Sequence, residues 1–517
     1  MALNTSAKNS LYVFTGTLTS RILGFIRVVL IGTTLGYTRL SDSYSLANET
    51  PNMMYELILG SLIASTMVPF FVRQFKNKDS ESDNALISFV VVSSLCLTAI
   101  CLALSPFIAD IMTSLNKSSN ANAQSELVLF FLLFFLPQIF FYALTSAMSA
   151  YLAARAKFVA AAFAPVINNI IVILTVLWVR SQQNIDYSSL VNLTKSNDVQ
   201  VLAIGTTLGV VAITFILAVV FIKNGGRFKF VSWKNESIKA LISSSKWMVA
   251  YAFANQIALF VIIAIANGFK GGVAMYLVAW SFFQLPHGLI ANSIMTTMVP
   301  KITHSMDGTN AGEKTLELIK QSALSLILFM CAISAIGIAV ATPGLDLLLS
   351  HGNINSSQAE HTARVLIGFL SFLPAFSLYL FCVRIGNAFN LTKKIFYINV
   401  IQNLVNIILA ISLKDKFGIV GISTSFSISY MIVIFLSIKL INTKLTHNFV
   451  EHKLSVSILT MSIAAAAIGY IASSQISNNF YSILAGLISS MIPLMLLLTI
   501  EKRSIKQLIS SVKKLPA

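Results

Sequence analysis

Residues 20–27 read SRILGFIR and residues 48–56 read NETPNMMYE. Each stretch lies in an apolar run long enough to enter a bilayer. Asp42 stands between them, and the second run continues to Pro69. Two arginines and two glutamates therefore lie inside otherwise apolar segments. An ionisable side chain at that depth costs about 2.5 kcal/mol or more and by default marks a functional path. The rest of the chain is expected to form the scaffold that accommodates residues 20–69.

The composition is that of a polytopic membrane protein. Of the 517 residues, 56% are hydrophobic and 11% are charged, and the mean hydropathy is +0.79. A soluble protein would be about 25% charged. The polar first ten residues argue against a cleavable signal peptide. No Walker loop, dinucleotide fingerprint or HExxH motif occurs, and the four cysteines lack metal-ligand spacing. We therefore expect no enzyme activity, no metal and no cofactor.

Apolar runs of transmembrane length recur along the whole chain, and they predict an all-α fold with about fourteen membrane-spanning helices. The second and eighth spans contain Pro51 and Pro286, so both are expected to be bent or locally unwound. The predicted spans are 11–36, 44–75, 85–114, 127–154, 159–181, 200–223, 240–269, 272–299, 317–342, 361–389, 394–413, 418–442, 454–473 and 481–500.

The distribution of basic residues predicts the topology. Most of the 36 Lys and Arg residues fall in loops on one side, including the basic tail from Lys502 to Lys514. The positive-inside rule makes that side cytoplasmic, so both termini are expected in the cytoplasm of a plasma-membrane protein. The net charge of +17 is then a topological signal with an attraction to anionic membrane lipids, and we expect no nucleic-acid partner.

A short internal sequence repeat indicates a duplicated architecture. Residues 65–69 read STMVP and residues 296–300 read TTMVP, each at the end of a proline-containing span and before a basic loop. Internal repeats are typical of transporters, whose substrate binds between the two halves. The sequence thus predicts an N-lobe at 1–235, a C-lobe at 236–445, and a helix pair with a basic tail at 446–517.

The first span carries the candidates for anion binding. On a helical wheel Arg21, Gly24 and Arg27 share one polar arc, and the two arginines lie about 9 Å apart along the axis. Guanidinium groups bind phosphate oxygens in a planar, bidentate way. The alternative is that one arginine reaches the membrane interface and the other pairs with an acid.

The second and eighth spans add further polar candidates. Asn52 and Glu56 belong to a ribbon that repeats every four residues, and Gln284 is the polar candidate of the eighth span. Glu56 either pairs with Arg21 or Arg27 structurally, or exchanges that partner for substrate or a proton during transport.

Four more residues are candidates for gating or ion coupling: Asp42, Glu49, His287 and Arg384. A lone histidine beside a bent helix is more often a packing residue, and Arg384 could instead reach the interface. Asn399, Asn403 and Asn406 form a further polar ladder, which is more easily explained as a link between helices than as a groove.

These residues resemble a known family, the MurJ/MviN lipid II flippases. The likeness covers nearly the whole chain. It is carried by Ser20–Arg27, Ser41–Asp42, Pro51–Asn52 and Val68–Pro69, with support from Phe163–Pro165, Asn169, Leu285–Pro286, Gly288 and Val299–Pro300.

The resemblance implies a MOP-superfamily exporter with two six-helix lobes around a cationic cavity and a final helix pair for the lipid tail. It implies that undecaprenyl-pyrophosphate-linked disaccharide-pentapeptide (lipid II) moves from the cytoplasmic to the outer leaflet for cell-wall synthesis. Other wall-synthesis proteins are further candidate partners.

Arg21 and Arg27 match the family's cavity arginines, but the chain departs from the family pattern elsewhere. Val28 replaces an acid, Tyr55 and Ser281 replace the other two cavity arginines, and Gly60 replaces a glutamate.

Three alternatives remain at this point. The chain could flip another polyprenyl-linked glycan, act as a drug or cation antiporter, or serve as a non-transporting scaffold for wall-synthesis enzymes. The arginine pair argues against an antiporter for cationic drugs.

Overall fold

The structure is a computed structural model that describes residues 2–57, 67–77, 80–118, 120–182, 190, 193–229, 231, 236–306 and 311–501. The described residues form helices and no strand, so the predicted all-α class is confirmed. The chain divides into two compact units, Met1–Ala274 and Met275–Ala517. The division into regions 1–235, 236–445 and 446–517 stays a prediction.

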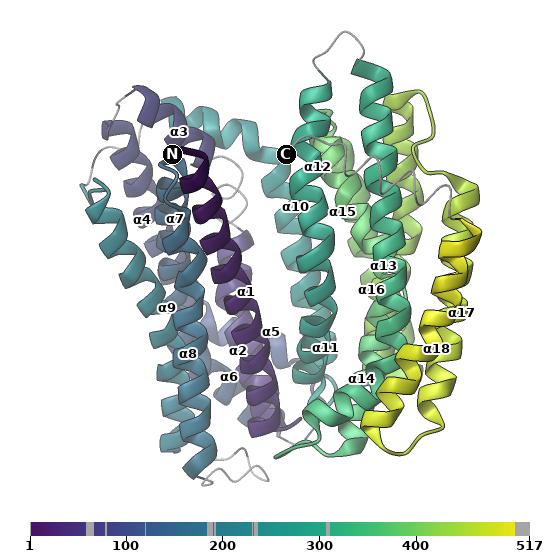
Figure 1. Cartoon of the computed structure of the whole chain (residues 1–517). Helices are drawn as coiled ribbons and strands as arrows, with labels where there is room; N and C mark the ends of the chain where they lie inside the picture. Colours follow the sequence, from purple (N-terminus) through teal and green to yellow (C-terminus); the bar gives the residue numbers. More distant parts are fainter. Residues whose placement is uncertain are drawn as a thin grey trace. The chain divides into compact units, whose positions relative to one another are not determined.

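The first unit contains ten α-helices and one 3₁₀ turn among its described residues (Figure 1). They are α1 (Ala2–Leu35), α2 (Arg39–Tyr55), α3 (Val68–Asn77), α4 (Ser80–Ala103), α5 (Ser105–Thr113), α6 (Ala121–Phe135), α7 (Gln138–Ala154), α8 (Phe158–Gln182), η3 (Leu193–Lys195), α9 (Asn197–Lys223) and α10 (Glu236–Ala266).

Helix α7 is central to the packing of the first unit. It contacts α2, α3, α4, α8 and α9, while α1 lies along α8 and α2 lies against α6. Between α2 and α6, the ring of Tyr44 meets Phe131 and Phe135 edge to face, with both centroid distances 5.7 Å. Such pairs contribute about 0.5–1.5 kcal/mol each beyond their burial. Aromatic packing therefore fixes α2, which carries several of the predicted site residues.

The second unit takes most of α11 and all later helices. They are α11 (Gly272–Pro286), the π-helical turn η4 (His287–Ala291), α12 (Asn292–Ser305), α13 (Ala311–Leu349), α14 (Ser356–Leu370), α15 (Leu373–Ala388), α16 (Thr392–Leu445), α17 (His452–Ser474) and α18 (Asn479–Ile500).

Helix α13 is the main packing partner within the second unit. It contacts α12, α14, α15, α17 and α18. A cluster of aromatic rings joins α11, α14 and α16, in which Trp280 lies 5.4 Å from Phe369 and 5.1 Å from Phe426. The final pair, α17 and α18, pack on each other as well as on α13. The C-terminal helix pair is therefore an integral part of this unit.

The number of spans agrees approximately with the predicted fourteen. Eleven described helices are long and apolar enough to cross a membrane, or twelve if α14 and α15, bent by 45°, form one span. Helix α16 covers two predicted spans, with a break at Gly418 (φ 59°, ψ −139°). The second predicted span passes through residues 58–66, which lie outside the described residues.

Both predicted irregularities occur near their prolines. Pro286 ends α11 and is followed directly by the π-helical turn η4. Pro51 lies inside α2, which ends at Tyr55 with a π-type turn at residues 56–57. π-turns change the helical register and are frequent at functional sites, so side-chain directions after each proline differ from those of a regular helix.

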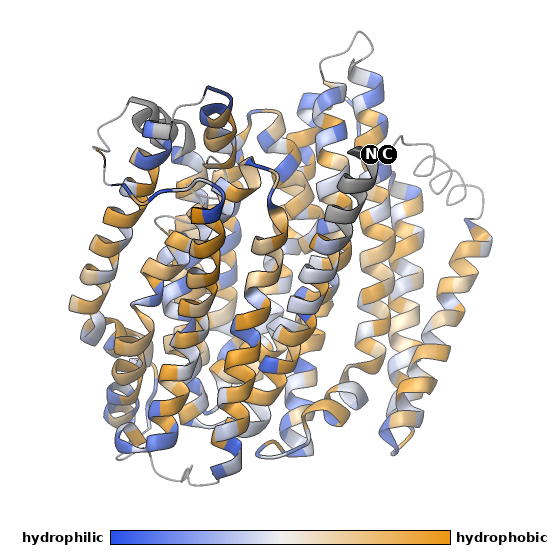
Figure 2. Cartoon of the chain, turned by 60° about the vertical axis from the view of Figure 1, so that its left-hand side comes forward, coloured by the Kyte–Doolittle hydropathy of each residue, from blue (hydrophilic) through white to orange (hydrophobic). Residues whose placement is uncertain are grey.

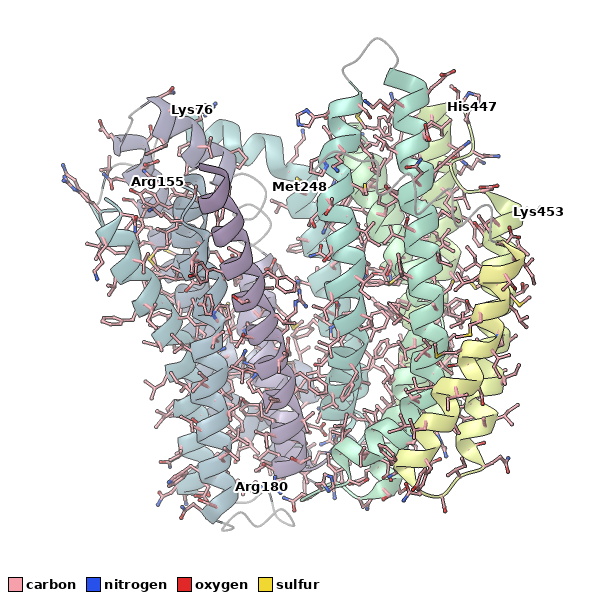
Figure 3. All side chains as sticks on the ribbon, in the orientation of Figure 1. Lys76, Arg155, Arg180, Met248, His447 and Lys453 are labelled. Carbon is pink, nitrogen blue, oxygen red and sulfur yellow. The ribbon has the colours of Figure 1, made fainter. Side chains whose placement is uncertain are left out.

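The exposed surfaces suit a membrane environment. Figure 2 shows hydrophobic residues along the helices and hydrophilic residues concentrated near their ends. On α9, Leu208 and Phe215 are 52% and 68% exposed. In the first unit, Lys76 and Arg155 lie at one end and Arg180 at the opposite end (Figure 3). This arrangement agrees with the predicted division of basic residues between two sides.

Candidate functional site

The contact between α1 and α8 determines how the first-span residues are presented. The Asn169 side-chain amide of α8 donates a hydrogen bond to the backbone oxygen of Ser20, at 2.9 Å. A Cβ atom on Gly24 would lie 3.5 Å from the same amide nitrogen, an ordinary contact. Gly24 therefore faces α8. A side chain as small as a methyl group would fit there, and the predicted role of Gly24 in substrate binding stays a prediction.

Arg27 lies in an unusual electrostatic environment. Its side chain is half-buried, and its Nε atom is buried without a hydrogen-bond partner in the described part of the chain. The guanidinium interacts electrostatically with the Glu49 carboxylate and with the hydroxyls of Tyr44 and Tyr142. Among the described residues, Arg27 and Glu49 form no direct ion pair. The carboxylate moderates the arginine's charge without occupying its donors.

Arg21 lies less than two turns before Arg27 on α1. It is half-buried, and no hydrogen bond or ion pair joins it to a residue that the structure describes. Both predicted arginines thus keep donors available for an external anion. An arginine in a membrane protein normally pairs with an acid, a carbonyl or a ligand, so both arginines remain candidates for anion binding, and that role stays a prediction.

The acidic partner of Arg27 differs from the one that the sequence favoured. Glu56 is half-buried at the π-type turn after α2, and among the described residues it forms no ion pair with either arginine. Asn52, one turn earlier, is exposed. Tyr55 is buried and donates a hydrogen bond to Ser146 Oγ at 2.7 Å. Tyr55 is therefore a packing residue, while substrate roles for Asn52 and Glu56 stay predictions.

Asp42 forms the most complete polar contact among the predicted residues. Its buried carboxylate accepts backbone N–H bonds from Gly271, Val273 and Ala274, at 2.7, 3.0 and 3.2 Å. The Arg39 guanidinium lies 3.6 Å away. The first N–H groups of a helix lack partners within that helix. Asp42 thus satisfies backbone donors among residues 271–274 within the first unit.

A buried amide network continues from Arg39, and sequence reasoning did not identify it. The guanidinium donates to the Asn267 backbone oxygen at 2.6 Å and to Asn116 Oδ1 at 3.0 Å. Gln124 joins the two asparagines, accepting from Asn116 at 2.7 Å and donating to Asn267 at 2.8 Å. In the sequence, these four residues are visible only as polar residues in or beside apolar runs. Their spacing does not indicate which of them form hydrogen bonds with each other.

In the second unit, the predicted residues lie around the π-helical turn. His287 is buried, shares a 3.0 Å hydrogen bond with Ser377 and packs on Phe376. This is the packing arrangement that the sequence favoured. Gln284, just before the turn, is half-buried. Its role in substrate binding stays a prediction. Arg384 of α15 donates to Asn292 Oδ1 of α12 at 2.6 Å.

The asparagines of α16 link the two halves of that helix. Asn403 donates to Asn399, and Ser425 donates to Asn406 Oδ1 at 3.0 Å. Gln402 similarly donates to Ser429 at 2.9 Å. This agrees with the simpler explanation of the ladder as a helix–helix link. No group of three or more His, Cys, Asp or Glu residues converges as a metal site within the residues searched.

Comparison with known proteins identifies strong similarities in sequence and fold. The family model described as "Lipid II flippase MurJ" matches residues 31–491. The chain is 22% identical over 423 residues to a probable lipid II flippase MurJ of Rickettsia prowazekii, covering 80% of this chain and 79% of that protein. It is 24% identical over 414 residues to the lipid II flippase MurJ of Thermosipho africanus, covering 80% and 81%.

Solved structures agree at the level of the fold. An inward-closed lipid II flippase MurJ aligns with a TM-score of 0.76 and 21% identity, covering 96% of this chain and 99% of that one. An inward-facing MATE-family multidrug transporter of the MOP superfamily aligns with a TM-score of 0.64 and 15% identity, covering 82% and 94%.

Proposed function

This chain belongs to the MurJ lipid II flippase family, and from that premise we propose that Arg21 and Arg27 hold the pyrophosphate of lipid II during its transfer. The family assignment makes the chain a multi-span membrane transporter whose substrate is lipid II. The proposed direction is from the cytoplasmic to the outer leaflet, with both termini in the cytoplasm and no catalytic step.

The available donors of the two arginines carry this proposal. The buried Nε of Arg27 has no partner in the described residues, and Arg21 has no ion pair there. A pyrophosphate offers several charged oxygens, and guanidinium groups form short, charge-assisted hydrogen bonds with such oxygens. Transferring a bare diphosphate through an apolar region would be very costly, so paired cations lower the barrier.

Glu49 has a separate proposed role, as the internal counter-charge of Arg27. When no substrate is bound, the carboxylate compensates part of the guanidinium charge through their electrostatic interaction. When the pyrophosphate binds, it competes with the Glu49 carboxylate for the positive charge of the Arg27 guanidinium. This competition supports release as well as binding, because the site is never left with a fully uncompensated arginine.

The remaining predicted residues are further candidates in the proposal, considered for each unit by itself. In the first unit, Asn52 and Glu56 offer polar groups suited to sugar and peptide hydrogen bonds. In the second unit, Gln284 offers a polar group and Arg384 a cation. Gly24 lies between the two arginines on α1 and keeps its predicted place in the substrate site. Transfer proceeds by alternating access, while the polyprenyl tail stays in lipid along α17 and α18.

Growth complementation with arginine variants tests the proposal. Cells that depend on this protein would express Arg21→Ala or Arg27→Ala, with membrane insertion verified by immunoblotting of isolated membranes. Both variants should fail to support growth, and Arg27→Lys should rescue only in part because lysine lacks the planar donor set. Arg180→Ala is the matched control, because Arg180 is exposed at the end of α8.

The outcome separates transport from a scaffolding role. If inserted Arg21→Ala and Arg27→Ala proteins both supported full growth, the arginines would not be needed and the pyrophosphate proposal would be wrong. A non-transporting scaffold predicts that result, because its binding surfaces do not require a charged pair on α1.

A further inference from the structure

An apolar groove on the first unit lies away from the predicted substrate residues. Helices α4 and α9 both pack on α7, and the groove is lined by all three helices and by residues 228–229. Its volume is about 390 Å³. Phe140, Phe141 and Leu144 of α7 line it together with Val91 of α4 and Phe215 of α9. Because α4 and α9 are long and apolar enough to cross a membrane, we expect this groove to face lipid.

One end of the groove is formed by the segment that follows α9, and this segment is held in place. The Ser88 hydroxyl of α4 donates to the Lys229 backbone oxygen at 3.2 Å and accepts from the Val231 N–H at 3.1 Å. The Phe228 ring lies 5.1 Å from the Phe221 ring at the end of α9. Side-chain and backbone contacts thus fix the segment to both walls of the groove.

Gly226 allows this segment to turn back onto α9. A Cβ atom at this position would come within 2.4 Å of the Phe221 ring, so a larger residue requires the ring to move. The turn places residues 228 and 229 in the lining of the groove.

The charges at this end are basic. Lys229 lines the groove and is exposed, and Arg227 is exposed two residues earlier. No acidic residue is among those that line the groove. The groove therefore combines an apolar lining with one basic residue, Lys229, whose backbone oxygen is held by Ser88, while Arg227 is a second exposed basic residue two positions earlier in the chain. An anionic phospholipid is complementary to this groove, because it has an apolar acyl chain and a negatively charged phosphate.

We propose that this groove binds an anionic membrane phospholipid, with one acyl chain between α4 and α9 and the phosphate at Lys229 and Arg227. Basic pockets between transmembrane helices are suited to anionic headgroups. The site differs from the proposed path of the substrate tail, which follows α17 and α18 of the second unit. The bound lipid would also cover exposed aromatic surface on Phe215 and Phe228.

Native mass spectrometry of the purified full-length protein tests the charge specificity. The protein would be titrated with phosphatidylglycerol or phosphatidylcholine carrying identical acyl chains. We expect the protein to bind phosphatidylglycerol more tightly than phosphatidylcholine. Lys229→Ala should weaken phosphatidylglycerol binding about fivefold, because each basic residue near an anionic headgroup contributes about the same attraction. The Arg227→Ala/Lys229→Ala double variant should weaken it further. Lys444→Ala is the matched control, because Lys444 is exposed at the end of α16.

A second pair of variants tests the position of the acyl chain. Ala218 lines the groove, whereas its exposed neighbour Val219 does not. Ala218→Phe should therefore reduce phosphatidylglycerol binding severalfold with both basic residues intact, and Val219→Phe should leave it unchanged.

Three results would each overturn the proposal. They are equal binding of the two lipids by the unmodified protein, an unchanged preference in the double variant, and equal binding by the Ala218→Phe and Val219→Phe proteins. The first two exclude headgroup recognition at Lys229 and Arg227, and the third excludes this groove. None of them bears on the transport role of Arg21 and Arg27.

Discussion

Arg27 and Glu49 illustrate how a membrane protein can keep a cation available. A direct ion pair would occupy the guanidinium donors, and an isolated arginine would carry a large desolvation cost. The electrostatic interaction without an ion pair is intermediate between these two cases. Arg27 is stabilised by the field of a carboxylate, and no residue that the structure describes forms a hydrogen bond or an ion pair with its guanidinium.

Glu49→Gln should strengthen anion binding and slow turnover. Removing the carboxylate leaves Arg27 with a larger uncompensated charge, which corresponds to about fivefold tighter binding for an interaction on the order of 1 kcal/mol at the effective dielectric of a partly buried site. The measurement is lipid II binding to the purified protein, combined with the rate of lipid II transfer in reconstituted vesicles.

Glu360→Gln provides the comparison for that measurement. Glu360 is exposed and pairs only with its helical neighbour Arg364 among the described residues, so both binding and transfer should stay as in the unmodified protein. Weaker lipid II binding by the Glu49→Gln protein would contradict the role of Glu49 as a competing counter-charge.

At the residue scale, sequence reasoning predicted the chemistry better than the contacts. The arginines of α1 were identifiable because ionisable residues are rare in apolar runs. The sequence could not show which neighbours Gly24 and Glu56 face. A helical wheel does not reveal that α8 covers one side of α1. It also assumes 100° per residue, which does not hold through the π-type turn at residues 56–57.

At the scale of elements, Asp42 connects two helix starts that are far apart in the sequence. It lies in the first turn of α2, while its three backbone donors belong to Gly271, Val273 and Ala274 at the start of α11. Since Arg39 also holds the Asn267 and Phe269 carbonyls, α2 fixes both the end of α10 and the start of α11.

Asp42→Asn should destabilise the protein by about 2–3 kcal/mol, because an amide removes the charge and replaces one acceptor oxygen by a donor facing N–H groups. Thermal unfolding of the purified protein, followed by tryptophan fluorescence, should show a lower midpoint. Asp110→Asn is the control, since Asp110 is exposed and its carboxylate accepts only from the Ser125 hydroxyl among the described residues. Equal midpoints for the two variants would show that the Asp42 contacts contribute little.

The elements themselves were largely predictable, because twenty-residue apolar runs must become helices in a bilayer. Pro286 correctly indicated an irregular eighth span, which the structure resolves as the π-helical turn η4. The contacts of Asp42 were not predictable, since they require knowledge of which loop lies beside α2. Of the asparagine ladder in α16, Asn406 accepts from Ser425 across the break at Gly418, a partner that the spacing of the asparagines does not indicate.

At the scale of the whole molecule, two helical units of similar size carry different chemistry. The first presents the arginines of α1 with Glu49, and the second presents Gln284 and Arg384 near a π-helical turn. The internal sequence repeat predicted a duplicated architecture from two proline-containing spans. The compact units themselves, Met1–Ala274 and Met275–Ala517, follow from contacts between helices that no sequence pattern gives.

The exposure of lipid II on the outer leaflet of cells depleted of this protein tests the central claim most directly. Exposure would be measured with an impermeant enzyme that cleaves only outward-facing lipid II, after returning the unmodified, Arg27→Ala or Arg180→Ala protein. We expect that depletion abolishes exposure, that the unmodified and Arg180→Ala proteins restore it, and that Arg27→Ala does not. Unchanged exposure after depletion would show that this protein does not carry lipid II to the outer leaflet.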